Sequence, residues 1–551
     1  MKRKKTSSSK QQTVTATCSH LPDECWEIIF RLIINDDDNS NKCGILNPLS
    51  LVSKQFLSVT DRLRLTLRVY GDEELHRISE RFTNLNSIVL AIFCIDSDEL
   101  LRKISRFQWK QLRSLSLSDR PSIPTNGLRA FSQKITTLTS LNFSQIPSLS
   151  SSDLFLIAEC FPLLEELNLS HSTNCKNYTS YVDGVEALSL ALIKLRKVNL
   201  SSFPINNQSL FHLFNNCKYL EDVIIFECDE ITRAGLASAI RERPTLRSLS
   251  FSTSDLNEEH RQLFATSHFI DSLVSLKGLT CLVFNYLNIS DELLYSIARE
   301  DLPLTRLDLP FCTNYSYNGI LCLLSKCRRI QHLNLQCAVF LNDQNVVQLS
   351  SILGDLVSIN LSVCMELTES ALFALVKNCP SLSEIKMERI GRLSDIVGNS
   401  DSLGKLCVYP QLKSLYLGDN SWLSDKILIM VASSFPNLLL LDLESCNHIS
   451  EGICQVLRKC CKIRHLNLAD CSRVKLLGMN FVPNLEVLNL SYTEVDDEIL
   501  YLISKNCSGL LQLHLDDCSG VTKKGLECVR KNCRQLREHG CIIPSSHMQQ
   551  L

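Results

Sequence analysis

The stretch LVSINLSVCMELTESALFALVKNCPS, residues 356–381, contains the pattern that decides the fold. Its first six residues have the form L-x-x-L-x-L, and alternating apolar residues predict a short strand with one apolar side. The second half predicts a helix that begins after Thr368, the expected N-cap, and ends before Pro380. The buried face of this helix is expected to consist of Leu372, Phe373, Leu375 and Val376. One unit is therefore a strand followed by a returning helix.

The same unit recurs along most of the chain, with 25 or 26 residues as the commonest step. Units start at 85, 112, 138, 164, 195, 220, 246, 279, 304, 330, 356, 382, 412, 438, 463, 485 and 510, and a truncated eighteenth starts at Leu536. This is the signature of leucine-rich repeats. Each unit covers the apolar flank of its neighbour. The expected fold is therefore an α/β, curved, right-handed solenoid with a parallel sheet on the concave side and helices on the convex side.

The 26 cysteines follow the repeats. Six lie three residues after the last leucine of a strand motif: Cys228, Cys312, Cys364, Cys446, Cys471 and Cys518. Six more lie three residues before the next unit: Cys217, Cys327, Cys379, Cys460, Cys507 and Cys533. No C-x-x-C pair is present, which argues against a zinc knuckle. We expect reduced, buried structural thiols; metal and disulfide interpretations remain the alternatives.

The second cysteine slot, seen in LTESALFALVKNCPSL and VTKKGLECVRKNCRQL, resembles the cysteine-containing class of leucine-rich repeats. That class is commonly joined to an F-box. The first seventy residues contain no repeat, so a separate N-terminal domain is expected there.

The segment LPDECWEIIFRLI, residues 21–33, predicts a helix with apolar residues around most of its circumference. Trp26, Ile29, Phe30 and Ile33 form one stripe, which Cys25, Ile28 and Leu32 widen. A helix in a small domain needs only one buried side, and about fifty residues have little core of their own. A second protein is therefore expected to cover the other side.

LPDECWEIIFRLI together with LSLVSKQFLSV resembles an F-box, a short all-α domain that docks onto a Skp-type adaptor and through it a cullin. Carried over by the resemblance, the adaptor-binding residues are Leu21, Pro22, Trp26, Ile29, Phe30, Leu51, Val52 and Phe56. Pro22 is expected at the first helical position, and Leu51, Val52 and Phe56 on a second helix. Phe56 stands where the family usually has tryptophan. The acidic segment 36–42 makes the spacing longer than usual and is expected to be a solvent loop.

The domain organisation expected from these features is a disordered basic tail (1–18), an F-box (19–70), a solenoid of about 17–18 units (71–541) and a C-terminal tail (542–551). Three units are long, those that start at 164, 246 and 382. Insertions in solenoids project as loops, so contact roles are possible there.

The concave surface should carry the third, fifth and seventh residues of each motif. From the ninth unit onward these positions more often hold charged or bulky residues. The candidate target-binding residues are Arg306, Asp308, His332, Glu384, Lys386, Glu388, Tyr416, Asp442, Glu444, His465, His514 and Asp516. The simpler interpretation is a solvated sheet face. The more specific interpretation is a mildly acidic binding site for a target segment that carries Lys or Arg.

The chain has 551 residues and a net charge of −2, so no overall field favours nucleic acid or a membrane as a partner. No catalytic motif is found, and no metal or cofactor is expected. The interpretation is a plant-like F-box/leucine-rich-repeat protein, a non-enzymatic subunit of an SCF-type ubiquitin ligase. It would bind a protein target for ubiquitination and proteasomal degradation, in the cytoplasm, the nucleus or both.

Three alternatives remain open. A hormone or small-molecule receptor would need a dense cluster of cations for a polyphosphate, and the concave positions offer few. A non-ligase repeat scaffold would lack an adaptor. An extracellular ectodomain would explain the five N-x-S sites at Asn142, Asn168, Asn199, Asn360 and Asn489, but no signal peptide pattern precedes them.

Overall fold

The computed structural model describes residues 21–35, 42–69, 75–82, 84–90, 96–107, 109–172, 181–253, 264–391, 407–474, 483–536 and 541–542. The tail expected at 1–18, residues 543–551 of the tail expected at 542–551, and residues 36–41 of the acidic segment 36–42 lie outside these ranges. The described residues form three N-terminal helices and one long repeat array. The array is a leucine-rich-repeat solenoid, as the sequence predicted.

The array is built on one sheet of 19 parallel strands among the described residues, with each strand paired to the next in chain order. Seventeen of them, β2 to β18, begin at the third residue of a predicted unit. The strands are β1 (Thr66–Val69), β2 (Ser87–Leu90), β3 (Ser114–Ser116), β4 (Ser140–Asn142), β5 (Glu166–Asn168), β6 (Lys197–Asn199), β7 (Asp222–Ile225), β8 (Ser248–Ser252), β9 (Cys281–Asn285), β10 (Arg306–Asp308), β11 (His332–Asn334), β12 (Ser358–Asn360), β13 (Glu384–Lys386), β14 (Ser414–Tyr416), β15 (Leu440–Asp442), β16 (His465–Asn467), β17 (Val487–Asn489), β18 (Gln512–His514) and β19 (Cys541–Ile542).

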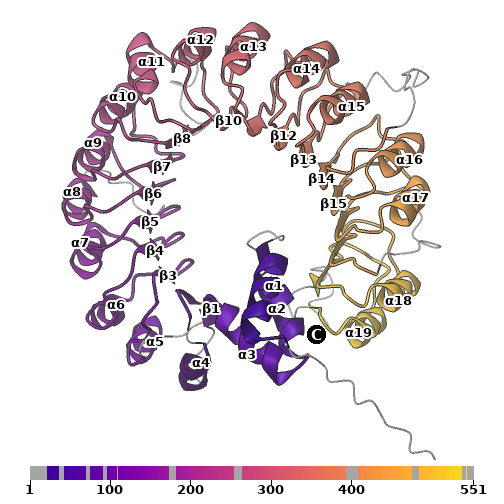
Figure 1. Ribbon diagram of the computed structural model, residues 1–551, viewed down its shortest axis with the longest axis horizontal. Coiled ribbons are helices and arrows are strands. Elements are labelled where there is room, and N and C mark those ends of the chain that lie inside the picture. Colours follow the sequence, from indigo (N-terminus) through magenta and orange to yellow (C-terminus); the bar gives the residue numbers. More distant parts are fainter. Residues whose placement is uncertain are drawn as a thin grey trace, which may run out of the picture.

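The helices of the repeats lie on the outside of the curve and the strands on the inside (Figure 1). They are α4 (Leu75–Arg81), α5 (Ser97–Ile104), α6 (Thr125–Ser132), α7 (Ser151–Cys160), α8 (Val182–Ala191), α9 (Asn207–Asn216), α10 (Arg233–Arg241), α11 (Ser267–Val274), α12 (Asp291–Arg299), α13 (Tyr317–Lys326), α14 (Asp343–Ser350), α15 (Glu369–Asn378), α16 (Asp425–Ser434), α17 (Gly452–Lys459), α18 (Asp497–Asn506) and α19 (Lys523–Asn532). The array curves through most of a circle, which leaves an opening between its first and last repeats (Figure 1).

Helix α15 shows how the sequence predicts a unit. Thr368 is its N-cap, and the Thr368 hydroxyl accepts the backbone N–H of Ser370 at 3.1 Å. Leu372, Leu375 and Val376 are buried, as predicted, whereas Phe373 is only partly buried. The helix ends at Asn378, two residues before Pro380. Local capping and an apolar stripe therefore determine the helix bounds.

The eighth residue of each unit turns the chain from strand to helix. It has a positive φ in fifteen units, from Asp119 to Asp517, and no glycine occupies it in any of them. Its backbone N–H is bonded to the next repeat: that of Val363, for example, donates to the carbonyl of Glu388 at 2.8 Å. A second ladder of hydrogen bonds thus continues past the ends of the strands.

The twelve cysteines in the two repeated slots are all buried, and none of the described cysteines forms a disulfide. Burial raises the pKa of Cys228 and Cys446 to about 12, well above the usual thiol value. These thiols therefore stay protonated at neutral pH, and the predicted structural role is confirmed for the described residues.

The N-terminal unit contains three helices, α1 (Asp23–Asn35), α2 (Lys42–Ser50) and α3 (Lys54–Leu63), instead of the expected pair. It has a small core of its own around Phe30, Ile34, Leu46, Val59 and Leu63. The prediction that Leu51 and Val52 share a helix with Phe56 is wrong, because they form the turn before α3. Ser53 caps α3 by accepting the N–H of Phe56 at 3.1 Å, which separates the two helices.

The boundary between the two parts differs from the sequence estimate. Helix α3 ends at Leu63 and β1 begins at Thr66, so the sheet starts inside the range 19–70 assigned to the first domain. Helix α1 begins at Asp23, one residue later than the position expected from Pro22, whose carbonyl accepts the N–H of Trp26 at 3.3 Å.

Candidate functional site

One side of helix α1 packs on α3 through three aromatic rings. The ring centroid of Phe56 lies 4.6 Å from that of Trp26 and 4.9 Å from that of Phe30. Phe30 is 1% exposed. Phe56 therefore supplies the aromatic anchor inside the unit, and Phe30 has no surface to offer a partner in this conformation.

The other side of α1 is exposed and apolar. Ile28 and Leu32, one helical turn apart, are 60% and 63% exposed, and Ile33 extends the same surface. Leu51 and Val52 are also exposed, Leu51 to 87%. The sequence predicted a second apolar side for this helix, and the structure identifies the residues that form it. We call Leu21, Ile28, Leu32, Ile33, Leu51 and Val52 the N-terminal apolar face.

The eight residues predicted to bind the adaptor thus divide into two sets. Leu21, Pro22, Leu51 and Val52 are exposed, whereas Trp26, Ile29 and Phe56 are half-buried against the small core that contains Phe30. The predicted set does not include Ile28, Leu32 and Ile33, which are exposed as well. Their i, i+4 spacing could have identified Ile28 and Leu32, but it could not show which apolar stripe faces inward.

Polar contacts fix α1 against α3. Gln55 donates to Asp23 at 2.9 Å, and Arg62 donates to the other Asp23 oxygen at 3.0 Å. These two bonds, that of Gln55 first, lower the pKa of the Asp23 carboxyl below its usual value. Similar contacts tie the unit to the array: Arg81 donates to Asp61 at 2.7 Å, and Asn84 donates to the carbonyl of Arg62 at 3.1 Å. The N-terminal unit is therefore joined to the sheet without a flexible linker.

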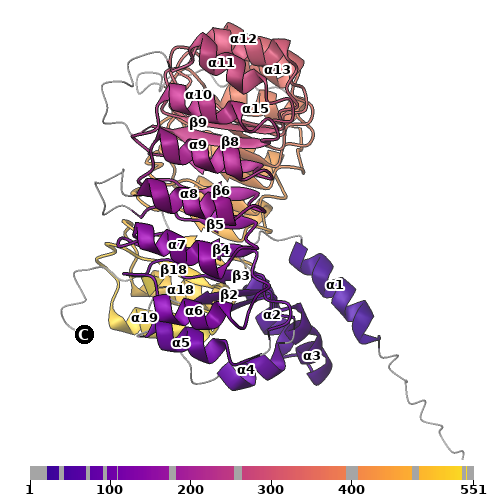
Figure 2. The same cartoon turned by 90° about the vertical axis from the view of Figure 1, so that its left-hand side faces the viewer.

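The views from two sides agree on where this unit lies. It occupies the opening between the first and last repeats (Figure 1), and α1 projects beyond one edge of the ring (Figure 2). The contacts of Arg81 with Asp61 and of Asn84 with Arg62 therefore connect the unit that carries the N-terminal apolar face to the first repeat.

The concave residues predicted to bind a target lie on β10 to β18, with Glu388, Glu444 and Asp516 just beyond their strands. Arg306 and Asp308 pair with each other, with Nη2 2.7 Å from Oδ2. Asp308 is buried, and this burial raises the pKa of its carboxyl even though Arg306 opposes the shift. Asp308 is thus engaged inside the protein, which leaves Arg306 as the exposed member of the pair.

On β13 the charged residues contact one another and residues of the two adjacent strands, β12 and β14. Glu384 accepts from the Ser358 hydroxyl at 2.9 Å and lies 3.9 Å from Lys386. The Lys386 ammonium lies 4.6 Å from the ring centroid of Tyr416 on the next strand. Such a cation–π contact orders both side chains.

The carboxylates Glu388, Asp442 and Glu444 gather around a position that has no side chain, Gly418. Asn467 donates to Asp442 at 3.0 Å and to Glu444 at 3.1 Å. Burial, and then the charge of Asp442, raise the pKa of Glu388 above its usual value. The structure therefore brings three of the six acidic candidates together, whereas Glu384 belongs to the Lys386–Tyr416 group.

The remaining candidates are spread apart. His332, His465 and His514 lie on β11, β16 and β18, so they do not form one cluster. Asp516 accepts from the Ser491 hydroxyl at 3.2 Å. Among the described residues, no group of three His, Cys, Asp or Glu side chains could hold a metal ion.

The asparagines of the N-x-S sites have a structural role. The Oδ1 atoms of Asn142, Asn168, Asn199, Asn360 and Asn489 each accept the N–H of the serine two residues later, at 2.9–3.1 Å. This Asx turn prepares the left-handed eighth residue. None of the described helices is long and apolar enough to cross a bilayer.

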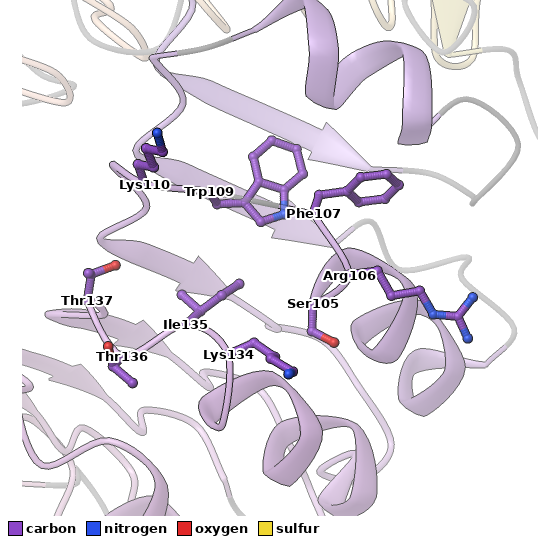
Figure 3. A pocket seen from close by; sticks show the side chains of 9 residues that line it. All are labelled: Ser105, Arg106, Phe107, Trp109, Lys110, Lys134, Ile135, Thr136 and Thr137. Carbon is purple, nitrogen blue, oxygen red and sulfur yellow. The ribbon is translucent and has the colours of Figure 1, made fainter.

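A cavity of about 600 Å³ lies away from these residues, between the loops that precede β3 and β4 (Figure 3). It is lined by Ser105, Arg106, Phe107, Trp109, Lys110, Lys134, Ile135, Thr136 and Thr137. No sequence pattern predicted it. Its cations follow the carboxyl ends of α5 and α6, where positive charge complements the helix dipole. That position explains them without a ligand.

Comparison with solved structures finds distant likenesses, and no family model matches the chain. A chain in the crystal structure of the Rad7 and Elc1 complex in yeast shares 19% identity and has a TM-score of 0.47, over 78% of this chain and 90% of that chain. A chain in the TLR13–ssRNA13 complex shares 15% identity, with a TM-score of 0.41, over 84% of this chain and 71% of that chain.

Proposed function

We propose that this chain is a non-catalytic substrate-recognition subunit of an SCF-type ubiquitin ligase. The N-terminal unit docks onto a Skp-type adaptor, which links it to a cullin, and the solenoid binds the target protein. Catalysis then depends on proximity, because the assembly holds a target lysine near a charged ubiquitin-conjugating enzyme. The chain positions the target protein and supplies no nucleophile. This role places it in the cytoplasm, the nucleus or both.

The observation that carries this proposal is the N-terminal apolar face. Ile28, Leu32 and Leu51 are each at least 60% exposed on a unit whose own core is small. Ile28 and Leu32 are one helical turn apart on the same side of α1, and such an exposed apolar patch marks an interaction site. The F-box resemblance of this segment supplies the kind of partner. The rigid joint from α3 to β1 supplies the second requirement, a fixed distance between adaptor and target.

The test is co-purification of the full chain with a Skp-type adaptor, comparing the wild type with an Ile28→Asp/Leu32→Asp variant. The substituted side chains are on the surface, so the variant should fold and lose the adaptor. Substituting Ile29 and Phe56 would be less informative, because both pack against the small core.

The matched control is Leu190→Asp on α8, which is also 60% exposed but lies on the convex side of the array. It should leave the adaptor complex intact. A wild-type chain that fails to bind the adaptor would leave a repeat scaffold and overturn the proposal. So would an Ile28→Asp/Leu32→Asp variant that still binds.

A further inference from the structure

The eighth residue of each unit is unusual in four consecutive repeats. Elsewhere this left-handed position holds polar residues, such as Asp119, Ser202 and Asp470, with Tyr492 as the one aromatic among the described units. From the eighth to the eleventh unit it holds Tyr286, Phe311, Cys337 and Val363, with φ values of 57°, 55°, 67° and 64°. We call these four residues the apolar rim stripe.

These residues occupy a conformation that is unfavourable for them. Bulky and β-branched side chains at positive φ are genuine outliers, and such strain clusters at binding sites. Packing does not require them there, because Tyr286 is 43% exposed and the other three are only partly buried. The strain is thus not explained by a contribution to the core.

The backbone holds the stripe in a fixed row. The N–H groups of Tyr286, Phe311, Cys337 and Val363 donate to carbonyls of the next repeat at 3.2, 3.0, 2.9 and 2.8 Å. The rings of Tyr286 and Phe311 are stacked, with centroids 5.0 Å apart and planes 8° apart. Neighbouring strands are about 4.8 Å apart, so four side chains span roughly 15 Å.

The surroundings of the stripe are acidic. In these four units the rim residues 285–293, 310–318, 336–344 and 362–370 include Asp291, Glu292, Asp343, Glu366 and Glu369 and contain no Lys or Arg. Glu388 and Glu444 occupy the seventh position of the twelfth and fourteenth units, and the next eighth residue, Arg389, pairs with Asp419 at 2.6 Å. Asp291 and Asp343 cap the next repeat, each through a serine or threonine hydroxyl 2.6 Å away. Their charges still contribute to the field.

We infer that the apolar rim stripe is an anchor site for the target protein. Its occupant is an extended target segment with aromatic or aliphatic residues flanked by Lys or Arg. Charge complementarity selects this chemistry, because an apolar row within an acidic rim favours a basic flank and disfavours an acidic one. This inference rests on the proposed function, since it names the chemistry of the target.

The test begins with a library of random 12-residue peptides displayed on phage and selected on the full chain. The enriched peptides should carry apolar residues beside Lys or Arg. Their affinities are then measured by fluorescence anisotropy for the wild type and for a Tyr286→Asn/Phe311→Asn variant. Asparagine tolerates positive φ, so this variant should keep or raise the melting temperature while binding weakens at least tenfold.

The control variant Tyr219→Asn removes a more exposed tyrosine, 64% accessible, from the edge of the array at which the strands begin. It should leave the peptide affinity unchanged. Three results would overturn the inference: no enrichment, enriched peptides without basic residues, or equal affinity in the rim variant. Co-purification with the adaptor, measured on the same proteins, reports separately on the proposed function. A chain that selects basic apolar peptides but binds no adaptor keeps the anchor site and loses the ligase role.

Discussion

The Sγ of Cys446 lies 3.2 Å from the carbonyl oxygen of Leu417, the last strand-motif leucine of the preceding repeat. The same contact recurs for all six cysteines of this slot, at S···O distances of 3.0–3.5 Å. In the second slot, thiols such as that of Cys379 reach a carbonyl at the helix end of the preceding repeat. The cysteines therefore connect repeats, beyond filling space within one.

An adjacent pair of cysteines tests this role. Cys460 is buried and donates to the carbonyl of Phe435 at 3.4 Å, whereas Cys461 is exposed. Cys460→Ala should lower the free energy of unfolding by about 1–2 kcal/mol, because it removes a buried hydrogen bond and leaves a small cavity. Cys461→Ala should be neutral. Urea denaturation of the two variants measures the difference, and equal stabilities would exclude the role.

Stability should fall at alkaline pH. Burial raises the pKa of Cys217, Cys312, Cys364 and Cys471 from 9.0 to about 12. Unfolded thiols ionise near their ordinary pKa while folded ones stay neutral, so stability is fully present below pH 9 and is lost as pH rises toward 12. Each such thiol should contribute up to about 1.4 kcal/mol per pH unit in that window. Denaturation between pH 7 and 10.5 measures the slope. A free energy of unfolding that stays constant between pH 9 and 10.5 would contradict it.

Two glycines should respond oppositely to alanine. A Cβ on Gly452 would lie 2.8 Å from the Asp425 Cα in the preceding helix, whereas one on Gly354 would meet open space. Gly452→Ala should destabilise the array by about 1–3 kcal/mol through overpacking, even though alanine favours helices. Gly354→Ala should be neutral or slightly stabilising. Thermal unfolding compares the two, and a stabilising Gly452→Ala would show that the helices separate easily.

Neutralising Glu388, Asp442 and Glu444 should weaken target binding without lowering the stability of the array. Glu388→Gln mimics the neutral form that burial and Asp442 favour, so it should raise stability at neutral pH. Combined with Asp442→Asn and Glu444→Gln, it should weaken binding of Lys- or Arg-flanked peptides about tenfold while adaptor binding survives. Calorimetry and anisotropy measure the two effects. Unchanged peptide affinity would leave these carboxylates as a solvated sheet face.

The N-terminal unit should depend on Phe56. Phe56→Ala removes the ring that packs against Trp26 and Phe30, and should cost about 2–3 kcal/mol locally. Limited proteolysis should then cleave the unit before the array. Leu51→Ala, at an exposed position, should leave the proteolysis pattern unchanged. If both variants resist cleavage equally, the array must hold the unit in place.

The candidate sites were only partly predictable. The concave positions of Glu388, Asp442 and Glu444 follow from strand alternation, but their grouping around Gly418 depends on which strands are neighbours. The division of α1 into a packed side and an exposed side could not be read from its composition, because nearly every face is apolar. The position of α3 decides it, through the contact between Phe56 and Phe30.

The sequence by itself determined the repeating unit. The leucine spacing located seventeen strands, each beginning at the third residue of its unit, and the cysteine slots identified the buried thiols. These features depend on periodicity within about 26 residues, which local geometry enforces. Only the tertiary structure decided what connects one unit to the next: the thiol–carbonyl contacts, the strained rim of Tyr286 to Val363, and the place of the N-terminal unit in the opening of the ring. Those contacts join residues a full repeat or more apart, so no local pattern encodes them.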